Sequence, residues 1–271
     1  MSDERVHTIA VAQASAVVDD VAQNLATLES LVARARGGGA EIVVTPELFA
    51  TGYAPDRAWR HDGDAIRASL ADLARQHDIA IVASTVDSEP GAEATHRIAA
   101  SFFDPGGVER ARVHKRHLFG PVERQWMTPA RDYGAIIDWR GSRFGLGICY
   151  DLEFPEFARA LARRGAGILL IPTAVPTSEV DVHGPERAWH YSATVTSTLQ
   201  VPTRALENGV VIAYANHCGN GFTGLSCIAT PTGGTAVILD ENEGIGIAQI
   251  SPGAIARARA LNPYVGDLGR D

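Results

Sequence analysis

Cysteine is scarce in this sequence, and the spacings that usually bind metal ions are missing. The chain has three cysteines among its 271 residues, Cys149, Cys218 and Cys227. An odd, low number predicts free thiols rather than a framework of disulfides. Neither Cys-x-x-Cys nor His-Glu-x-x-His occurs, so we expect no metal site and no cofactor.

Long apolar runs and basic patches are lacking as well. The longest apolar stretch, residues 167–176, is too short to span a bilayer and contains two prolines. The first residues show no basic segment followed by a long apolar run, so we expect no signal peptide and a cytoplasmic location. The formal net charge of −8 argues against nucleic acid and anionic membranes as partners.

The chain alternates between short β-rich runs and amphipathic helices. The turn Asp104-Pro-Gly-Gly predicts a hairpin between two of the strands. No repeat or shift in composition marks a boundary, so we expect one α/β domain over residues 1–271, with sheet packed on sheet and helices outside. Spacing alone leaves this layering open. The predicted strands are 7–13, 41–47, 79–85, 97–104, 109–115, 144–150, 167–173, 210–217, 225–231, 235–240 and 244–250, and the predicted helices are 20–36, 64–77, 155–165 and 251–261.

Three polar residues lie where a predicted strand ends. Glu47 closes 41–47, Lys115 closes 109–115, and Cys149 comes near the end of 144–150. Ligands of α/β sheets bind outside the carboxyl ends of strands, so these side chains are expected to meet at one edge. A carboxylate, an ammonium and a thiol supply the base, the electrostatic stabiliser and the nucleophile that acyl transfer needs.

Each of these residues also fits an ordinary structural role. A lone cysteine in an apolar strand is usually part of the core, Glu47 follows a proline and suits a turn, and Lys115 lies in the basic run His-Lys-Arg-His. His114 and His117 flank the lysine as possible metal ligands, but no third ligand is spaced with them. Ser226 lacks the second glycine of a nucleophile elbow, which disfavours a serine hydrolase.

Three motifs around these residues resemble those of the nitrilase superfamily of carbon–nitrogen hydrolases. TPELFATGY (45–53) is similar to its glutamate motif, KRHLFGPVE (115–123) to its lysine motif, and GLGICYDLEFPE (145–156) to its cysteine motif. Three motifs in order are far more specific than any one of them. The resemblance continues over nearly the whole chain, through 204–209, 214–219, 222–226 and 257–267.

The resemblance implies a fold and a catalytic set. The fold is a four-layer αββα sandwich of two mixed sheets packed face to face, which forms a homodimer or a higher homo-oligomer. The catalytic residues are Glu47 as base, Lys115 as cation and Cys149 as nucleophile, with Glu123 as a supporting carboxylate. A neighbouring Lys115 is expected to favour the thiolate of Cys149, while Glu47 accepts the proton during attack.

The resemblance also indicates the kind of substrate. Tyr150-Asp151 after the cysteine is closer to the amidases than to the true nitrilases, so we expect hydrolysis of a small carboxamide to acid and ammonia through a cysteine thioester. Hydrolysis of an N-carbamoyl compound or a nitrile by the same triad is the alternative, and a catalytically silent partner protein is a weaker one. Tyr150, through its backbone N–H, and Tyr53 and Ala174 are expected at the substrate.

One segment departs from the family. Residues 175–200 form a longer connection than in most members, rich in acids, histidines and aromatic residues. We expect it to shape access to the substrate site, or else to be an oligomer contact or a surface helix. No motif supplies a cation for a substrate carboxylate, so neutral amides are expected, unless Arg187 or Arg204 points into the pocket.

Overall fold

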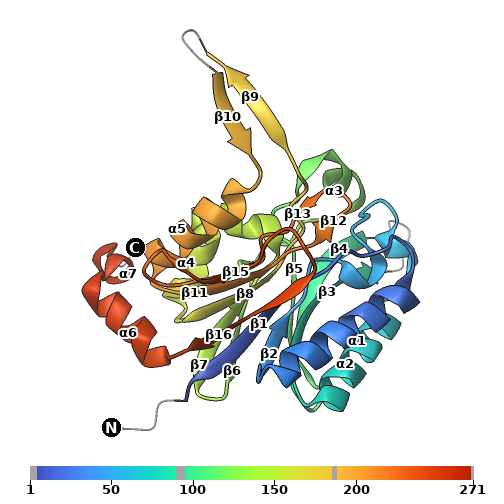
Figure 1. Cartoon of the computed structure of the whole chain (residues 1–271), viewed down its shortest axis with the longest axis horizontal. Helices are drawn as coiled ribbons and strands as arrows, with labels where there is room; N and C mark the ends of the chain where they lie inside the picture. Colours follow the sequence, from blue (N-terminus) through green and yellow to red (C-terminus); the bar gives the residue numbers. More distant parts are fainter. Residues whose placement is uncertain (1–4, 90–94, 185–187, 270–271) are drawn as a thin grey trace.

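Two six-stranded sheets packed face to face form the centre of the molecule, and helices cover their outer faces (Figure 1). The computed structural model describes residues 5–89, 95–184 and 188–269. The first sheet has the order β16-β1-β2-β3-β4-β5 and the second has the order β15-β14-β11-β8-β7-β6. Both sheets are mixed, because parallel pairs such as β1–β2 and β7–β8 lie beside antiparallel pairs such as β3–β4 and β11–β14.

Each of the eleven strands predicted from apolar patterning overlaps a strand of the two sheets, whereas β6 and the short strands β12 and β13 were not predicted. The first sheet contains β1 His7–Gln13, β2 Ile42–Val44, β3 Ala80–Glu89, β4 Thr95–Phe103, β5 Glu109–His114 and β16 Gly244–Ile250. The second contains β6 Ala135–Trp139, β7 Ser142–Leu146, β8 Ile168–Pro172, β11 Val211–Ala215, β14 Cys227–Ala229 and β15 Thr235–Ile238. Short strands β12 Cys218–Gly219 and β13 Phe222–Thr223 form a separate ribbon. The predicted hairpin is β4–β5.

Alternation of side chains along the strands produces the layers. Ile9 and Val11 of β1 face the core between the sheets, where they share one apolar cluster with Leu170 of β8. Ala10 and Ala12 face the opposite way. Successive side chains of a strand point to opposite faces, so a strand that is apolar on both faces lies between two apolar layers.

The helices bury the outer faces. Leu28 of α1 and Leu70 of α2 pack against the first sheet, while Phe157 of α4 and Ala205 of α5 pack against the second. This arrangement confirms the αββα sandwich that the resemblance implied. The helices are α1 Val21–Gly37, α2 Gly63–His77, α3 Gly120–Trp126, α4 Pro155–Arg163, α5 Val201–Asn208, α6 Pro252–Leu261 and α7 Tyr264–Asp267.

The long segment 175–200 is a β-hairpin that projects from the sandwich (Figure 1). Strands β9 Glu179–His183 and β10 Ala188–Ser192 pair with each other in a two-stranded sheet of their own. The expectation of a surface helix here is therefore wrong: apolar and polar residues alternate with the period of a strand. A single irregular turn, Thr196–Gln200, then leads into α5.

The helices of the described residues include none that is both long enough and apolar enough to cross a membrane.

Candidate active site

Cys149 lies in a tight turn between β7 and α4. The predicted strand 144–150 is wrong at its end, because β7 stops at Leu146 and Cys149 opens a 3-10 helix, η3, Cys149–Glu153. Cys149 has a φ of 47°, a left-handed conformation that costs a residue other than glycine about 1–3 kcal/mol and is often found at functional sites. Its sulfur lies 3.5 Å from the backbone nitrogen of Ala174.

Glu47 and Lys115 lie just beyond the ends of β2 and β5, as predicted, and their side chains meet. Lys115 Nζ donates to Glu47 Oε1 at 2.8 Å and to Glu123 Oε1 at 2.7 Å. All three side chains are almost completely buried. Backbone contacts hold Glu47 in place, since its N–H donates to Thr173 O at 3.0 Å and its carbonyl accepts from His217 Nε2 at 2.6 Å.

Glu123 is fixed on both of its oxygens. It comes from α3, and its Oε1 also accepts from the Tyr53 hydroxyl at 2.5 Å. Its Oε2 accepts from the backbone N–H of Phe119 at 2.7 Å. A carboxylate with this many donors is held in one position. Glu123 therefore orients Lys115, the supporting position predicted for it.

Glu47 has one oxygen to spare. Its Oε2 is buried and accepts no regular hydrogen bond from the described residues, which is uncommon for a buried polar atom and calls for an explanation. The thiol of Cys149 is close enough to act on this carboxylate through a hydrogen bond that lowers its pKa. The spare oxygen is thus available to accept a proton.

Burial dominates the ionisation of this cluster. It raises the pKa of Glu47 to about 7, with Glu123 adding to the rise and Lys115 opposing it. Burial would lower the pKa of Lys115, but the surrounding carboxylates outweigh it and the pKa is raised, so the ammonium persists. Burial and the charge of Glu47 raise the pKa of Cys149 well above its usual value. Lys115 lowers this pKa and so favours the thiolate, as expected from its charge, but burial and Glu47 outweigh its effect.

A small cavity of about 110 Å³ opens over the Cys149 sulfur. Its size is of the order of the roughly 150 Å³ cavity that holds a benzene molecule. Ala174 lines it as predicted, whereas Tyr53 is engaged by Glu123 and the Tyr150 ring packs between Phe119 and Phe154. The lining consists of Phe119, Cys149, Glu153, Ala174, Val175, Pro176, Ser178, Tyr191, Ala193 and Thr196.

Glu153 and Tyr191 are two of several lining residues that the sequence did not assign to the substrate site. Glu153 ends the 3-10 helix that Cys149 begins, and its position in the cysteine motif was the available signal. Tyr191 comes from β10, which brings the projecting hairpin to the edge of the cavity. Of the two arginines considered, Arg187 lies outside the described residues. Arg204 donates to the backbone carbonyls of Leu152 and Glu153 and so supports η3 from behind.

The remaining candidates have structural surroundings. His114 pairs with Asp87 and His117 with Asp151, and the described residues contain no group of three side chains suited to a metal ion. Cys218 and Cys227 are buried free thiols, and burial raises the pKa of Cys227 to about 12. Burial alone accounts for this rise, so no carboxylate of the described residues acts on the Cys227 thiol as Glu47 acts on that of Cys149.

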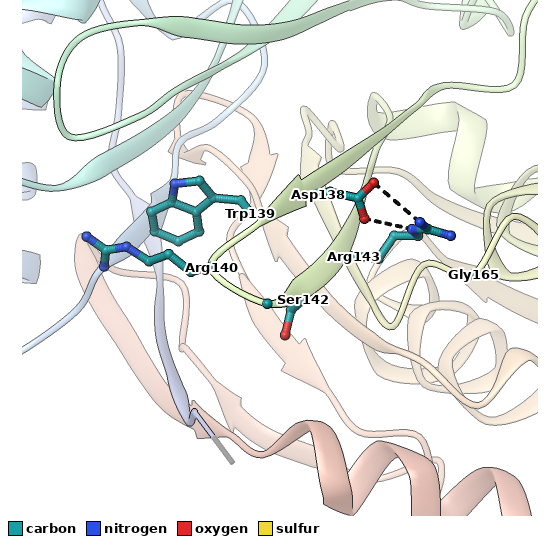
Figure 2. Close-up of a pocket in the computed structure, with 7 residues that line it drawn as sticks. Asp138, Trp139, Arg140, Ser142, Arg143 and Gly165 are labelled. Carbon is teal, nitrogen blue, oxygen red and sulfur yellow. Dashed lines mark hydrogen bonds and ion pairs between the residues drawn. The ribbon is translucent and has the colours of Figure 1, made fainter. Parts of the chain in front are cut away.

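A larger, open hollow of about 490 Å³ lies at the opposite end of β7, at the β6–β7 turn (Figure 2). Ser142 in this hollow hydrogen bonds to His7 Nε2 at 2.7 Å, and the other ring nitrogen of His7 contacts Glu41. Glu41 is also paired with two arginines. The Asp138–Arg143 ion pair beside Ser142 is largely exposed, so this hollow is open to bulk solvent, unlike the buried cluster of Glu47, Lys115 and Cys149.

The fold is an αββα sandwich with a buried Glu–Lys–Cys cluster at one edge, and comparison with known proteins places it among the hydrolases that act on carbon–nitrogen bonds. The family model for carbon-nitrogen hydrolases matches residues 8–260. This chain belongs to the carbon–nitrogen hydrolase family, as an amidase-like member of the nitrilase superfamily.

Relatives over most of the chain carry several activities. A hydrolase in the pqqF 5' region of Pseudomonas protegens is 30% identical over 92% of this chain and 84% of its own. N-carbamoylputrescine amidase of Solanum lycopersicum is 30% identical over 90% and 86%. Among solved structures, an amidase of Nesterenkonia sp. AN1 has a TM-score of 0.82 and 32% identity, over 96% of this chain and 93% of that one.

Proposed function

We propose that this protein hydrolyses a small carboxamide to the carboxylic acid and ammonia through a thioester on Cys149. The observation that carries the proposal is the buried carboxylate of Glu47, which has one oxygen without a regular hydrogen bond and lies within hydrogen-bond reach of the Cys149 thiol, in a cluster already oriented by Lys115. A base with a pKa of about 7 accepts and returns protons at neutral pH. Hydrolysis through a thioester has two half-reactions, and in each of them the base must first accept a proton and then return it.

In the first half-reaction the sulfur of Cys149 attacks the amide carbonyl carbon while its proton passes to Glu47. Charge develops on the carbonyl oxygen, where Lys115 Nζ and the backbone N–H of Tyr150 are the stabilising donors. The N–H groups of the first helical turn have no acceptor within the helix. The carbon–nitrogen bond then breaks, the nitrogen takes the proton from Glu47, and ammonia leaves.

In the second half-reaction water attacks the thioester. Glu47 takes one proton from the water as its oxygen bonds to the carbonyl carbon. The carbon–sulfur bond breaks, the proton returns to the sulfur, and the carboxylic acid leaves with Cys149 restored. Lys115 stays protonated throughout, because its pKa is raised by the carboxylates around it. It acts as a fixed positive charge rather than as an acid.

The cavity and the relatives favour a small amide. A space of about 110 Å³ leaves room for a short acyl group and little else. The Nesterenkonia amidase, 33% identical to this chain in that structure, was solved in complex with butyramide. The competing activity is hydrolysis of an N-carbamoyl compound, which the N-carbamoylputrescine amidase relative favours.

The test compares three compounds that share a propyl group: butyramide, butyronitrile and propylurea. We expect kcat/KM for the amide to exceed the other two by at least about tenfold, or about 1.4 kcal/mol of transition-state discrimination. Products identify the reaction, because butyramide gives one ammonia per acid and propylurea gives carbon dioxide and an amine as well. A higher kcat/KM for the nitrile or the urea would overturn the amidase assignment.

A further inference from the structure

Glu153 places a negative charge in the wall of the substrate cavity. It ends the 3-10 helix that Cys149 begins, and both residues line the same cavity. Its side chain is half-buried, and burial raises the pKa of its carboxyl group. Among the described lining residues, Glu153 is the acid and no lysine or arginine faces it there.

The Glu153 carboxylate has no ion-pair or hydrogen-bond partner among the described residues. Arg204 approaches it from behind, but its guanidinium donates to the Glu153 backbone carbonyl at 2.8 Å and pairs with Glu207 at 3.2 Å. Lys115 is occupied by Glu47 and Glu123. The charges of Lys115 and Arg204 act on the Glu153 carboxylate from a distance, but no cation of the described residues forms an ion pair with it, so the carboxylate is free to pair with a cation of the substrate.

Two aromatic rings line the same cavity as Glu153. Phe119 lines the cavity from the loop before α3 and Tyr191 lines it from β10. Faces of aromatic rings attract cations by their quadrupole, and the net charge of −8 attracts them over a longer range. A carboxylate with aromatic neighbours is a binding site for an ammonium group, not for an anion.

We propose that Glu153 forms an ammonium subsite, and that the preferred substrate is a carboxamide carrying a protonated amine a few bonds from its carbonyl carbon. The proposal rests on the amidase function proposed above and deepens it. The small cavity keeps the amine close to the reacting carbon, so short amino-acid amides fit better than long ones. This subsite replaces the preference for neutral amides expected from the motifs.

The experiment uses two substrates of the same shape, butyramide and 3-aminopropanamide, in which a methyl group and an ammonium group take the same place. We expect the wild-type protein to favour 3-aminopropanamide in kcat/KM by at least about tenfold, the factor that corresponds to about 1.4 kcal/mol. Glu153→Gln keeps the size of the side chain and should abolish the preference. Glu156→Gln, which removes an exposed charge three residues on, is the matched control and should keep it.

Binding to the Cys149→Ala variant, measured by calorimetry with the same two compounds, separates the subsite from the chemistry. Equal kcat/KM for both amides, or a preference that survives Glu153→Gln, would overturn the subsite and leave the amidase proposal standing. Tighter binding of 3-aminopropanamide that needs Glu153, with no turnover of either amide, would support the subsite and overturn the amidase proposal. Neither binding nor turnover would overturn both.

Discussion

The floor and the wall of the cavity are built in opposite ways. By the floor we mean Cys149, which lines the cavity, together with the buried cluster of Glu47, Lys115 and Glu123, whose charges are bound to one another. The wall contains the half-buried Glu153 carboxylate, which has no ion-pair partner among the described residues, and Tyr191, 44% exposed on a hairpin that projects into solvent. Fully buried charges are tolerated only when the protein itself supplies their partners. A partly exposed charge in the wall is solvated by water and can form an ion pair with a group of the substrate.

This difference separates chemistry from selection. Changes in the floor disturb groups that act on every substrate, so they should lower all rates together. Changes in the wall touch only the part of the substrate that varies, so they should reorder substrates. Each of the following predictions tests one side of this division.

Cys149→Ala should have the largest effect, a loss of at least about 10⁴-fold in kcat on every amide, as for other catalytic nucleophiles. Alanine fits the turn without the sulfur, so the fold should persist, which circular dichroism can check. Ser142→Ala is the control, because Ser142 is a hydroxyl residue that hydrogen bonds to a histidine, His7, and lies at the opposite end of β7. If Ser142→Ala lost activity and Cys149→Ala retained it, the active site would have to be assigned to the hollow at the β6–β7 turn.

Glu47→Gln should lower kcat by about 10²–10⁴-fold, the usual contribution of a general base. Because the pKa of Glu47 is raised to about 7, its basic form is lost as the pH falls, so wild-type kcat/KM should rise with pH through about 7. Stopped assays from pH 5 to pH 9 should show this limb in the wild type and not in Glu47→Gln. The same limb in the variant would assign the titration to another group.

Replacing residues 179–192 with a short glycine–serine turn should have an intermediate effect that falls on selection. Loss of Tyr191 opens the cavity, so the ranking of amides should change while iodoacetamide still alkylates Cys149.

The hairpin also exposes an apolar face, which predicts that this face is covered in the assembly. The face consists of Val180, Val182, Trp189 and Tyr191.

Light scattering on the same two proteins tests the assembly. The wild type should give at least twice the chain mass of 28.8 kDa, since the family resemblance implies a dimer, and the shortened protein should give a lower mass. An active monomeric wild type would contradict the assembly prediction. If the ranking of amide substrates and the mass in solution both stayed the same, the hairpin would have no role in substrate selection or in assembly.

Cys227→Ala should have the smallest effect. Cys227 packs beneath α5 among apolar side chains, away from the floor, so activity should remain and the free energy of unfolding should fall by about 1 kcal/mol. Urea denaturation measures that change. A large loss of kcat with an unchanged unfolding free energy would show that the division between Cys149 and the structural thiols is wrong.

The floor could be predicted from the sequence, because its residues follow apolar runs whose ends meet at one edge and stand in recognisable motifs. Glu47 and Lys115 lie where that reasoning put them. The order of the four layers was predicted from the family resemblance. The spacing of strands along the chain does not show which faces of the two sheets pack against each other. Lys115 acts on the pKa of the Cys149 thiol in the predicted direction, but burial raises that pKa most, and the extent of burial could not be read from the motif.

The wall could not be predicted in the same way. The alternation Val180, Val182 and Trp189, Tyr191 was a visible strand signal, but an exposed strand lacks the buried apolar run on which strand prediction relies. The inward position of Glu153 depends on the left-handed turn at Cys149, a conformation that composition does not reveal. Substrate selection therefore depends on local geometry that the sequence does not show, whereas catalysis depends on residues that stand in recognisable motifs.

The most direct test of the central claim, that hydrolysis passes through an acyl group on Cys149, is partitioning to hydroxylamine. Butyramide and methyl butyrate would form the same butyryl thioester, so the wild-type protein should convert both to butyrohydroxamate and butyrate in one ratio at a given hydroxylamine concentration. The Cys149→Ala variant should form neither product. A ratio that depends on the leaving group, or acid formed without any hydroxamate, would contradict the account.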